Sequence, residues 1–260
     1  MYPIIHLAEG LDIPTYFLVI SLVVSAGLFW IVRRSEVYSL PKKNVLDLSL
    51  LLMLSALLGA RVFHVVYENF DFYRQYPVRI FYLWEGGFVF YGGMILAFIA
   101  TFTYLHFIHA PKKGDYFDAF APVLSFTYGF GRVGCFMAGC CYGKDCDLPW
   151  AVDHRHPTQL YATFWEIGAI LLLLGLEKIP RNKRPKMLSR PGDLFILWMF
   201  LHAVGRILME HYREDFRGEE IFGLSVSTVF SFGLLLVSAA LLGGFARRWI
   251  VSAQNNGIQK

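Results

Sequence analysis

The sequence predicts an all-α integral membrane protein with about seven transmembrane helices, and three observations lead to that class. Of the 260 residues, 56% are hydrophobic and only 17% are charged, whereas soluble domains carry about 25% charged residues. Apolar stretches long enough to cross roughly 30 Å of hydrocarbon recur seven times. Basic residues alternate between dense and sparse in successive loops, as in polytopic membrane proteins. We expect one membrane domain comprising residues 1–260.

The apolar segments follow one another with short polar connections. They run from Pro14 to Val32, Val45 to Tyr67, Phe88 to Ile108, Tyr116 to Val133, Thr158 to Leu176, Asp193 to Met209 and Gly223 to Phe245. The first residues lack the basic start and small-residue cleavage site of a signal peptide, so the first segment is predicted to be a retained span. The fourth is short and glycine-rich, with Asp118 and Pro122 near its start. Such features also fit a broken or re-entrant helix.

The basic residues predict the orientation of the chain. Most of the 24 lysines and arginines lie in the loops after segments one, three, five and seven. These residues are Arg33, Arg34, Lys42, Lys43, Lys112, Lys113, Lys178, Arg181, Lys183, Arg184, Lys186, Arg190, Arg247, Arg248 and Lys260. Short cytoplasmic loops are enriched in lysine and arginine. The N-terminus is therefore expected outside and the C-terminus in the cytoplasm.

Three arginines lie inside apolar segments, namely Arg61, Arg132 and Arg206. Each costs about 2.5–3.5 kcal/mol at the centre of a bilayer on insertion scales. With about 1.5 Å of rise per residue, all three fall in the outer half of the membrane. A single such arginine is explained by snorkelling to the headgroups. Three on separate helices instead indicate a basic pocket, and guanidinium groups bind phosphate oxygens in bidentate fashion. A phospholipid headgroup is the expected ligand.

Further polar residues lie near the outer ends of the segments. Glu210 follows Arg206 by four positions, the spacing of a helical ion pair, and Arg213 lies just beyond. The others are Tyr16, His64, Tyr91, His156, Gln159, Glu166 and His202.

All four cysteines lie in the stretch "GFGRVGCFMAGCCYGKDC", which also matches the G-x-G-x-x-G pattern. A dinucleotide site is excluded because that pattern needs a preceding strand within a βαβ unit. Cys135, Cys140, Cys141 and Cys146 lack the C-x2-C spacing of a zinc ribbon, and two adjacent cysteines suit one tetrahedral ion poorly. We therefore expect no metal and no cofactor. Disulfides at the outer face and close packing of reduced thiols both remain open.

Several motifs, taken in order, resemble those of the prolipoprotein diacylglyceryl transferases of bacterial inner membranes. The stretch "GRVGCFMAGCCYG", residues 131–143, resembles the signature of that family. The surrounding motifs are "GARVFHVVY", "WEGGFVFYGG", "HPTQLY", "RPGDLF", "GRILMEHYRED" and "GLSVST". The resemblance covers nearly the whole chain.

The resemblance implies an enzyme that moves the diacylglyceryl group of phosphatidylglycerol onto a cysteine thiol in the lipobox of a secreted prolipoprotein, releasing glycerol 1-phosphate. It implies a multi-pass protein of the inner membrane, surrounded by membrane lipid, with its site in the outer leaflet half and no nucleic-acid partner. The implied catalytic residues are Arg132, Arg206, Tyr91 and His156. The implied substrate-binding residues are Arg61, Tyr16, Gly92, Gly93, Gln159, His202, Glu210 and Arg213. The two glycines are expected to permit close approach of the lipid.

The chain departs from the family pattern at several positions. Tyr91 stands where the family commonly has a histidine. Cys135, Ala138 and Cys140 replace two asparagines and a glutamate, Ala162 replaces a glutamate, and His202 replaces a tyrosine. Two alternatives therefore stay open. One is a lipid-binding relative with altered catalysis, and the other is a membrane thiol oxidoreductase using the outer cysteines.

Overall fold

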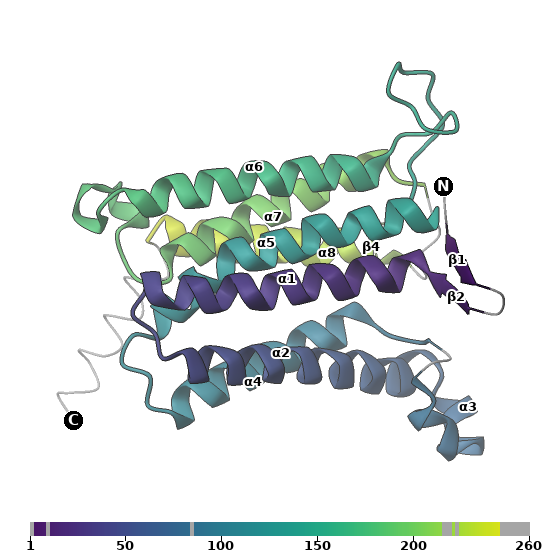
Figure 1. Cartoon of the computed structure of the whole chain (residues 1–260), viewed down its shortest axis with the longest axis horizontal. Helices are drawn as coiled ribbons and strands as arrows, with labels where there is room; N and C mark the ends of the chain where they lie inside the picture. The colour runs from purple at the N-terminus through teal and green to yellow at the C-terminus, as the bar shows by residue number, and fades with distance from the viewer. Residues whose placement is uncertain (1–2, 9–10, 84–85, 215–219, 222–223, 245–260) are drawn as a thin grey trace. The chain divides into compact units, whose positions relative to one another are not determined.

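The computed structural model describes residues 3–8, 11–83, 86–214, 220–221 and 224–244, and it is predominantly helical (Figure 1). A helix covers each predicted apolar segment: α1 (Thr15–Val37), α2 (Lys42–Phe63), α4 (Phe90–Phe107), α5 (Lys113–Ala138), α6 (Thr158–Lys178), α7 (Asp193–Tyr212) and α8 (Val226–Leu242). Within the described part, α1, α2 with its continuation, α6 and α7 are long and apolar enough to cross a membrane, and α4 and α8 are shorter apolar helices. The fold is consistent with a multi-pass membrane protein. The predicted ends Gly223 and Phe245, and the basic residues Arg247, Arg248 and Lys260, lie outside the described residues.

Short elements connect or precede these helices. They are the π-helical turn η1 (His64–Glu68), α3 (Phe70–Gln75), and the 3-10 turns η2 (Pro77–Phe81), η4 (Arg181–Lys183) and η5 (Lys186–Leu188). Two antiparallel hairpins were not predicted: β1 (Ile4–Ala8) with β2 (Leu11–Pro14), and β3 (Glu220–Ile221) with β4 (Leu224–Ser225). Each directly precedes a long helix, α1 or α8. Pairing of the two strands satisfies backbone groups that no helix can satisfy there.

The chain forms two compact units. One comprises residues 1–31 and 114–260, and the other comprises residues 32–113. Helix α1 begins in the first unit, and its last turns belong to the second. The predicted site residues of the fourth to sixth segments all lie in the first unit.

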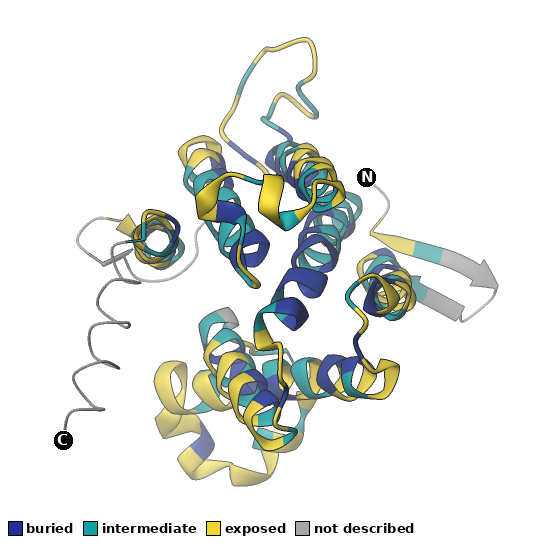
Figure 2. Cartoon of the chain, turned by 90° about the vertical axis from the view of Figure 1, so that its left-hand side faces the viewer, coloured by how far each residue is buried: buried dark blue, intermediate teal, exposed yellow. Residues whose placement is uncertain are grey.

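The long helices carry buried residues along one side and exposed residues along the other (Figure 2), and many of the exposed residues are large and apolar. Phe17, Phe164 and Leu236 are 64%, 68% and 70% exposed. Exposed apolar surface on this scale is unusual in soluble monomers. Lipid is the environment in which it carries no penalty.

Helix α5 is continuous, so the fourth segment is not broken, and α5 is not one of the four described helices that are long and apolar enough to cross a membrane. It runs for 26 residues with Pro122 inside it. The carboxylate of Asp118 accepts hydrogen bonds from the backbone N–H groups of Gly192 (2.9 Å), Leu194 (3.1 Å) and Phe195 (3.2 Å). The first amides of a helix have no partner within that helix. Asp118, itself fully buried, supplies the partner for the start of α7.

In the unit of residues 32–113, α2 and α4 pack closely through glycines. A Cβ atom on Gly92 would lie 2.4 Å from the carbonyl oxygen of Gly59 and 2.4 Å from Phe63 Cβ. A Cβ atom on Gly93 would lie 2.6 Å from the carbonyl oxygen of Ala56. Small residues permit such close contact between membrane helices. The structure therefore corrects the expectation that Gly92 and Gly93 make room for lipid, because the neighbouring helix occupies that space.

Gly92→Ala is expected to lower the free energy of unfolding by about 3 kcal/mol, because overpacking forces backbones apart. Gly175→Ala is the matched control, since Gly175 lies in α6 with open space around its Cα. That variant should be neutral or stabilising by up to about 1 kcal/mol, the difference in helix propensity. Thermal unfolding of both variants in detergent measures the difference. Equal unfolding temperatures would contradict the packing role.

Candidate functional site

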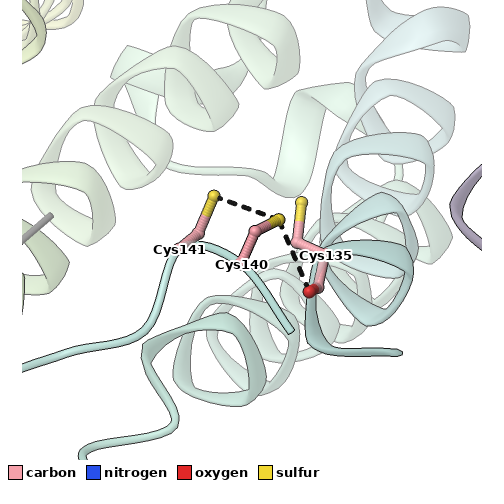
Figure 3. Close-up of side chains that lie close together, drawn as sticks. All are labelled: Cys135, Cys140 and Cys141. Atoms are coloured by element: carbon pink, nitrogen blue, oxygen red, sulfur yellow. Dashed lines mark hydrogen bonds between the residues drawn. The ribbon is translucent and has the colours of Figure 1, made fainter. Parts of the chain in front are cut away.

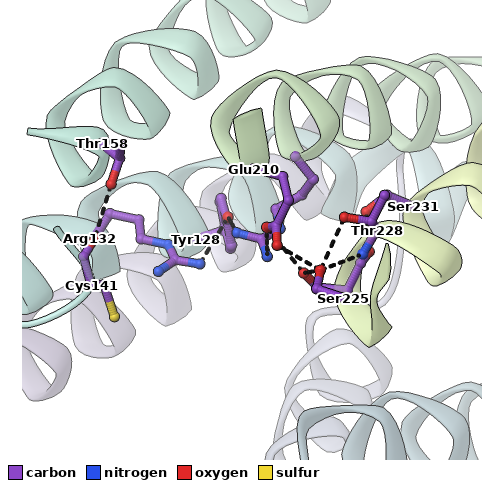
Figure 4. Close-up of polar contacts among 10 residues, drawn as sticks. Tyr128, Arg132, Cys141, Thr158, Glu210, Ser225, Thr228 and Ser231 are labelled. Carbon is purple, nitrogen blue, oxygen red and sulfur yellow. Dashed lines mark hydrogen bonds and ion pairs between the residues drawn. The ribbon is translucent and has the colours of Figure 1, made fainter. Parts of the chain in front are cut away.

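Two arginines from different helices meet at one tyrosine hydroxyl. Arg132 Nη2 in α5 donates to Tyr128 Oη at 3.1 Å (Figure 4), and Arg206 Nη1 in α7 donates to the same oxygen at 3.5 Å. The Arg132 guanidinium also lies 5.0 Å from the centre of the Tyr128 ring. A hydroxyl oxygen has two lone pairs and can accept from both donors. The geometry holds two positive charges close together within one unit of the structure.

Glu210 holds the second of these arginines in place. Its carboxylate lies 3.6 Å from Arg206 Nη2, and both side chains are largely buried. The same carboxylate accepts from the hydroxyls of Ser225 (2.5 Å) and Ser227 (3.2 Å) (Figure 4). Ser225 also caps α8 by accepting from the backbone N–H of Thr228. The end of α7 and the start of α8 are thereby joined through one carboxylate.

A buried polar network lies on the other side of Tyr128. Glu166 is 2% exposed, and its carboxylate contacts His202 Nδ1 at 2.6 Å, Ser125 Oγ at 2.5 Å and Trp198 Nε1 at 3.4 Å. The His202 ring packs edge-on against the Tyr128 ring, with 4.5 Å between centroids. Tyr128, Glu166 and Arg206 surround a small gap that has no room for a water molecule. The ring of His202, which was predicted to bind substrate, is thus held in place by its hydrogen bond to the Glu166 carboxylate.

The cysteines Cys135, Cys140 and Cys141 form a cluster beside Arg132. Their sulfur atoms all lie within 4.8 Å of one another, and the Sγ atoms of Cys140 and Cys141 are 3.7 Å apart (Figure 3). All four cysteines of the chain are free thiols. The structure thus brings together three thiols, including those of the adjacent Cys140 and Cys141, that their spacing in the sequence did not bring together.

The end of α5 explains why these sulfurs meet. Gly139 has φ +73°, and its N–H donates to the carbonyl of Phe136 while that of Cys140 donates to the carbonyl of Cys135. This pair of bonds is the Schellman motif that ends many helices, and it favours glycine at the left-handed position. Cys141 is also left-handed, with φ +64°. The chain therefore folds back over the last turn of α5, and the three thiols converge.

Electrostatics favour a charged thiolate at Cys141, which lies in the loop after α5. A hydrogen bond from Cys135, and the positive charges of Arg213 and Arg132, lower the pKa of Cys141 to about 5. Burial raises the pKa of the neighbouring Cys140 thiol. A thiol with a lowered pKa loses its proton at a lower pH than an ordinary cysteine. Cys141 is accordingly the member of the cluster that most readily becomes a thiolate.

Two side chains at the start of α6 hold the loop of Cys140 and Cys141 by hydrogen bonds. Thr158 Oγ1 donates to the carbonyl of Cys141 at 2.9 Å, and Gln159 Nε2 donates to the carbonyl of Cys140 at 2.5 Å. Gln159 is 2% exposed, and its Oε1 has no hydrogen-bond partner among the described residues. His156, predicted to be catalytic, bonds to the Tyr161 hydroxyl at 3.1 Å and packs against Tyr212.

Three further predicted site residues are Tyr16 and Arg213, in the same unit as the arginine pair, and Tyr91, in the other unit. The Tyr16 ring lies against Gly134, where an added Cβ would be 3.4 Å away, and its hydroxyl is within electrostatic range of Arg132 and the cysteine cluster. Arg213 is buried, and its backbone bridges to Gly143 in the cysteine loop. Tyr91 is half-buried in the first turn of α4, in the unit of residues 32–113.

Arg61 has a structural set of partners rather than a free guanidinium. It is 3% exposed, and its nitrogens donate to the carbonyls of Arg79, Ile80, Tyr82, Gly86 and Gly87 at 2.5–3.3 Å. A guanidinium offers five N–H donors in a fixed fork. The guanidinium of Arg61, which was predicted to bind substrate, has a structural role instead, because its N–H donors bind the carbonyls of the segment after α3 and hold that segment together.

Tyr128, Ser225 and Ser227 were not among the predicted site residues. Tyr128 precedes Arg132 by four positions, so both lie on one face of the helix. That spacing was the available signal for Tyr128. The two serines fall within or beside the quoted motif "GLSVST".

The apolar helices of the chain are typical of multi-pass membrane proteins. Residues 3–243 match the family model described as prolipoprotein diacylglyceryl transferase, and the chain belongs to that family. The resemblance seen in the motifs is confirmed.

Relatives of the chain carry the name phosphatidylglycerol–prolipoprotein diacylglyceryl transferase. The protein of Geobacter sulfurreducens is 30% identical over 242 residues, which is 88% of this chain and 87% of the relative. That of Vibrio vulnificus strain YJ016 is 32% identical over 79% of this chain and 74% of its own length. That of Clostridium tetani is 26% identical over 91% and 95%.

Proposed function

We propose that this chain transfers the diacylglyceryl group of phosphatidylglycerol to the lipobox cysteine thiol of secreted prolipoproteins, releasing glycerol 1-phosphate. Membership of the family, and relatives of that name at about 30% identity over most of the chain, support this activity. The observation that carries the proposal is the meeting of Arg132 and Arg206 at the Tyr128 hydroxyl.

The chemistry follows from that geometry. The acceptor thiolate attacks the glyceryl carbon that carries the phosphate ester, a C–S bond forms, and the C–O bond breaks with its electron pair passing to the phosphate oxygen. Negative charge gathers on the departing glycerol phosphate. Donors that are already in place stabilise such charge without reorganisation. Arg132 and Arg206 bind the phosphate, and Glu210 orients Arg206.

The membrane arrangement belongs to the same proposal. We infer one polytopic domain with seven spans in the bacterial inner membrane, its N-terminus outside and its C-terminus in the cytoplasm. The arginine pair then lies in the outer leaflet half, where phosphatidylglycerol and a translocated prolipoprotein both arrive. The distribution of lysines and arginines supports this orientation.

Complementation tests the function directly. The chain is expressed in a bacterium depleted of its own transferase, and the mass of a reporter lipoprotein is measured. We expect the lipobox cysteine to gain one diacylglyceryl group. An unmodified reporter at normal expression would instead favour the lipid-binding relative, the alternative suggested by Tyr91 and the replaced signature residues.

Tyr128→Phe is expected to lower the rate of transfer about tenfold, because the loss of one shared hydrogen bond costs roughly 1–2 kcal/mol. The ring contacts to Arg132 and His202 remain. Turnover of phosphatidylglycerol by the purified variant, with kcat and KM determined separately, gives the result. Tyr104→Phe is the matched control, since its hydroxyl contacts Asp47 in the unit of residues 32–113 instead. Equal losses in both variants would argue against a special role for Tyr128.

A further inference from the structure

We propose that Cys135, Cys140 and Cys141 bind one zinc ion whose open coordination position takes the thiol of the acceptor protein. The three sulfurs lie within 4.8 Å of one another, and those of Cys140 and Cys141 are 3.7 Å apart. Two thiolates on a tetrahedral zinc ion, with Zn–S bonds of about 2.3 Å, lie roughly 3.8 Å apart. The backbone therefore already holds the sulfurs of Cys140 and Cys141 at the spacing that the ion requires, with the Cys135 sulfur within 4.8 Å of both. Thiolate ligands favour zinc over magnesium or calcium.

The number of protein ligands indicates an open site. Cys146 is not a member of the cluster of described residues, and its backbone N–H bonds to the carbonyl of His154 in the loop beyond. Structural zinc sites have four protein ligands, whereas catalytic sites have three and leave the fourth position to water or substrate. A cluster of three thiols has the number of protein ligands that is typical of a catalytic zinc site.

The surroundings of the cluster suit a metal site. Gln159 and Thr158 donate to the carbonyls of Cys140 and Cys141, and the Schellman motif fixes Cys140 over Cys135. Hydrogen bonds of this kind around a metal site orient the side chains that bind the ion. Three thiolates and Zn²⁺ carry a net charge of −1, and a fourth thiolate makes it −2. Arg132 and Arg213 both interact electrostatically with the Cys141 sulfur and offset that charge.

A second observation points to a ligand at the same place. The Oε1 atom of Gln159 is buried and has no hydrogen-bond partner among the described residues. Leaving a buried acceptor unsatisfied costs about 1–3 kcal/mol. Gln159 also holds the cysteine loop, because its Nε2 donates to the carbonyl of Cys140.

The role of the ion rests on the proposed function. The acceptor thiol replaces water at the fourth position and passes its proton to solvent, because zinc lowers the pKa of a coordinated thiol until it is deprotonated. The bound thiolate attacks the glyceryl carbon, the C–S bond forms, and the ester C–O electron pair leaves on the phosphate held by Arg132 and Arg206. The thioether product is a poor zinc ligand and departs. His156 and His202 are engaged by Tyr161 and Glu166, so the ion supplies the activation that a free histidine would otherwise give.

Metal content tests the site independently of activity. The full chain is purified in detergent without chelator, and its metals are determined by mass spectrometry. We expect one zinc per chain, a loss of at least tenfold in Cys135→Ser and Cys141→Ser, and no loss in the control Cys146→Ser. Protein with no zinc, with copper or iron in its place, or with a disulfide within the cluster would overturn the proposal.

Cobalt reports the open position. Protein from cells grown in cobalt-supplemented minimal medium should show thiolate-to-cobalt absorption bands that intensify when a lipobox peptide is added. A peptide with serine for cysteine should leave the bands unchanged. Identical spectra with both peptides would overturn the acceptor role. Zinc binding in a chain that fails complementation would support the site and count against the proposed function alone.

The pH profile gives the kinetic signature. In Cys141→Ser, transfer at neutral pH should fall at least tenfold and then rise about tenfold per pH unit, because an unbound acceptor thiol ionises only near pH 8.5. Transfer by the unaltered chain should change little over that range. Parallel profiles would overturn the proposal.

Discussion

Arg206→Ala is expected to reduce diacylglyceryl transfer by about 100-fold or more, and Arg132→Ala by a similar factor. Removing one preorganised donor to a developing oxyanion costs about 2.7–4 kcal/mol, or a factor of 10²–10³ in kcat. Arg206→Lys should recover only part of the loss, because an ammonium group keeps the charge but cannot bind phosphate oxygens in bidentate fashion. Release of glycerol phosphate from phosphatidylglycerol by the purified variants provides the measurement.

The control for these variants is Arg190→Ala, since Arg190 is exposed between η5 and α7. It should retain full activity. Elution from a sizing column and the unfolding temperature show whether each variant is folded. A folded Arg206→Ala protein within threefold of normal activity would remove the arginine pair from the mechanism.

Glu166→Ala is expected to lower the free energy of unfolding by about 3 kcal/mol or more. The substitution leaves His202, Ser125 and Trp198 without their common acceptor in a buried place, and each unsatisfied group costs about 1–3 kcal/mol. Thermal unfolding in mixed lipid and detergent measures the change.

Lys178→Ala is the comparison on the same helix, since Lys178 is exposed at the end of α6, and it should change stability by less than about 0.5 kcal/mol. Glu166→Gln should fall between the two, because the amide retains one acceptor oxygen. If Glu166→Ala unfolds at the same temperature as Lys178→Ala, the network contributes nothing to stability.

The helices could be predicted from the sequence because a bilayer allows few alternatives. A long apolar segment must satisfy its own backbone, and helices achieve this in lipid. Helix α5 was predicted less securely, because the charged Asp118 and the helix-disfavouring Pro122 within its segment weaken the sequence pattern of a membrane helix. The partners that stabilise Asp118 are amides some 74 to 77 residues away in α7. No local pattern announces such a contact.

The candidate site was predictable in its charges and not in its packing. Arg132 and Arg206 could be predicted as functional residues because an arginine within an apolar membrane segment is energetically costly. Arg61 carried the same signal and yet serves five backbone carbonyls, a use that only the folded loop reveals. The cysteine spacing suggested no common site, since the turn at Gly139 that brings the thiols together depends on backbone conformation rather than on spacing.

The carboxylate of Asp118 also bears on how the chain is made. The leading amides of α7 find their acceptor on α5, which leaves the ribosome about 75 residues earlier. Synthesis from the N-terminus therefore places the Asp118 carboxylate in the protein before the first amides of α7 need an acceptor. Helix α7 can then enter the bilayer with a hydrogen-bond partner for those amides already present. A circularly permuted chain that emerged with α7 first would lose this advantage during biogenesis, although its final contacts would be the same.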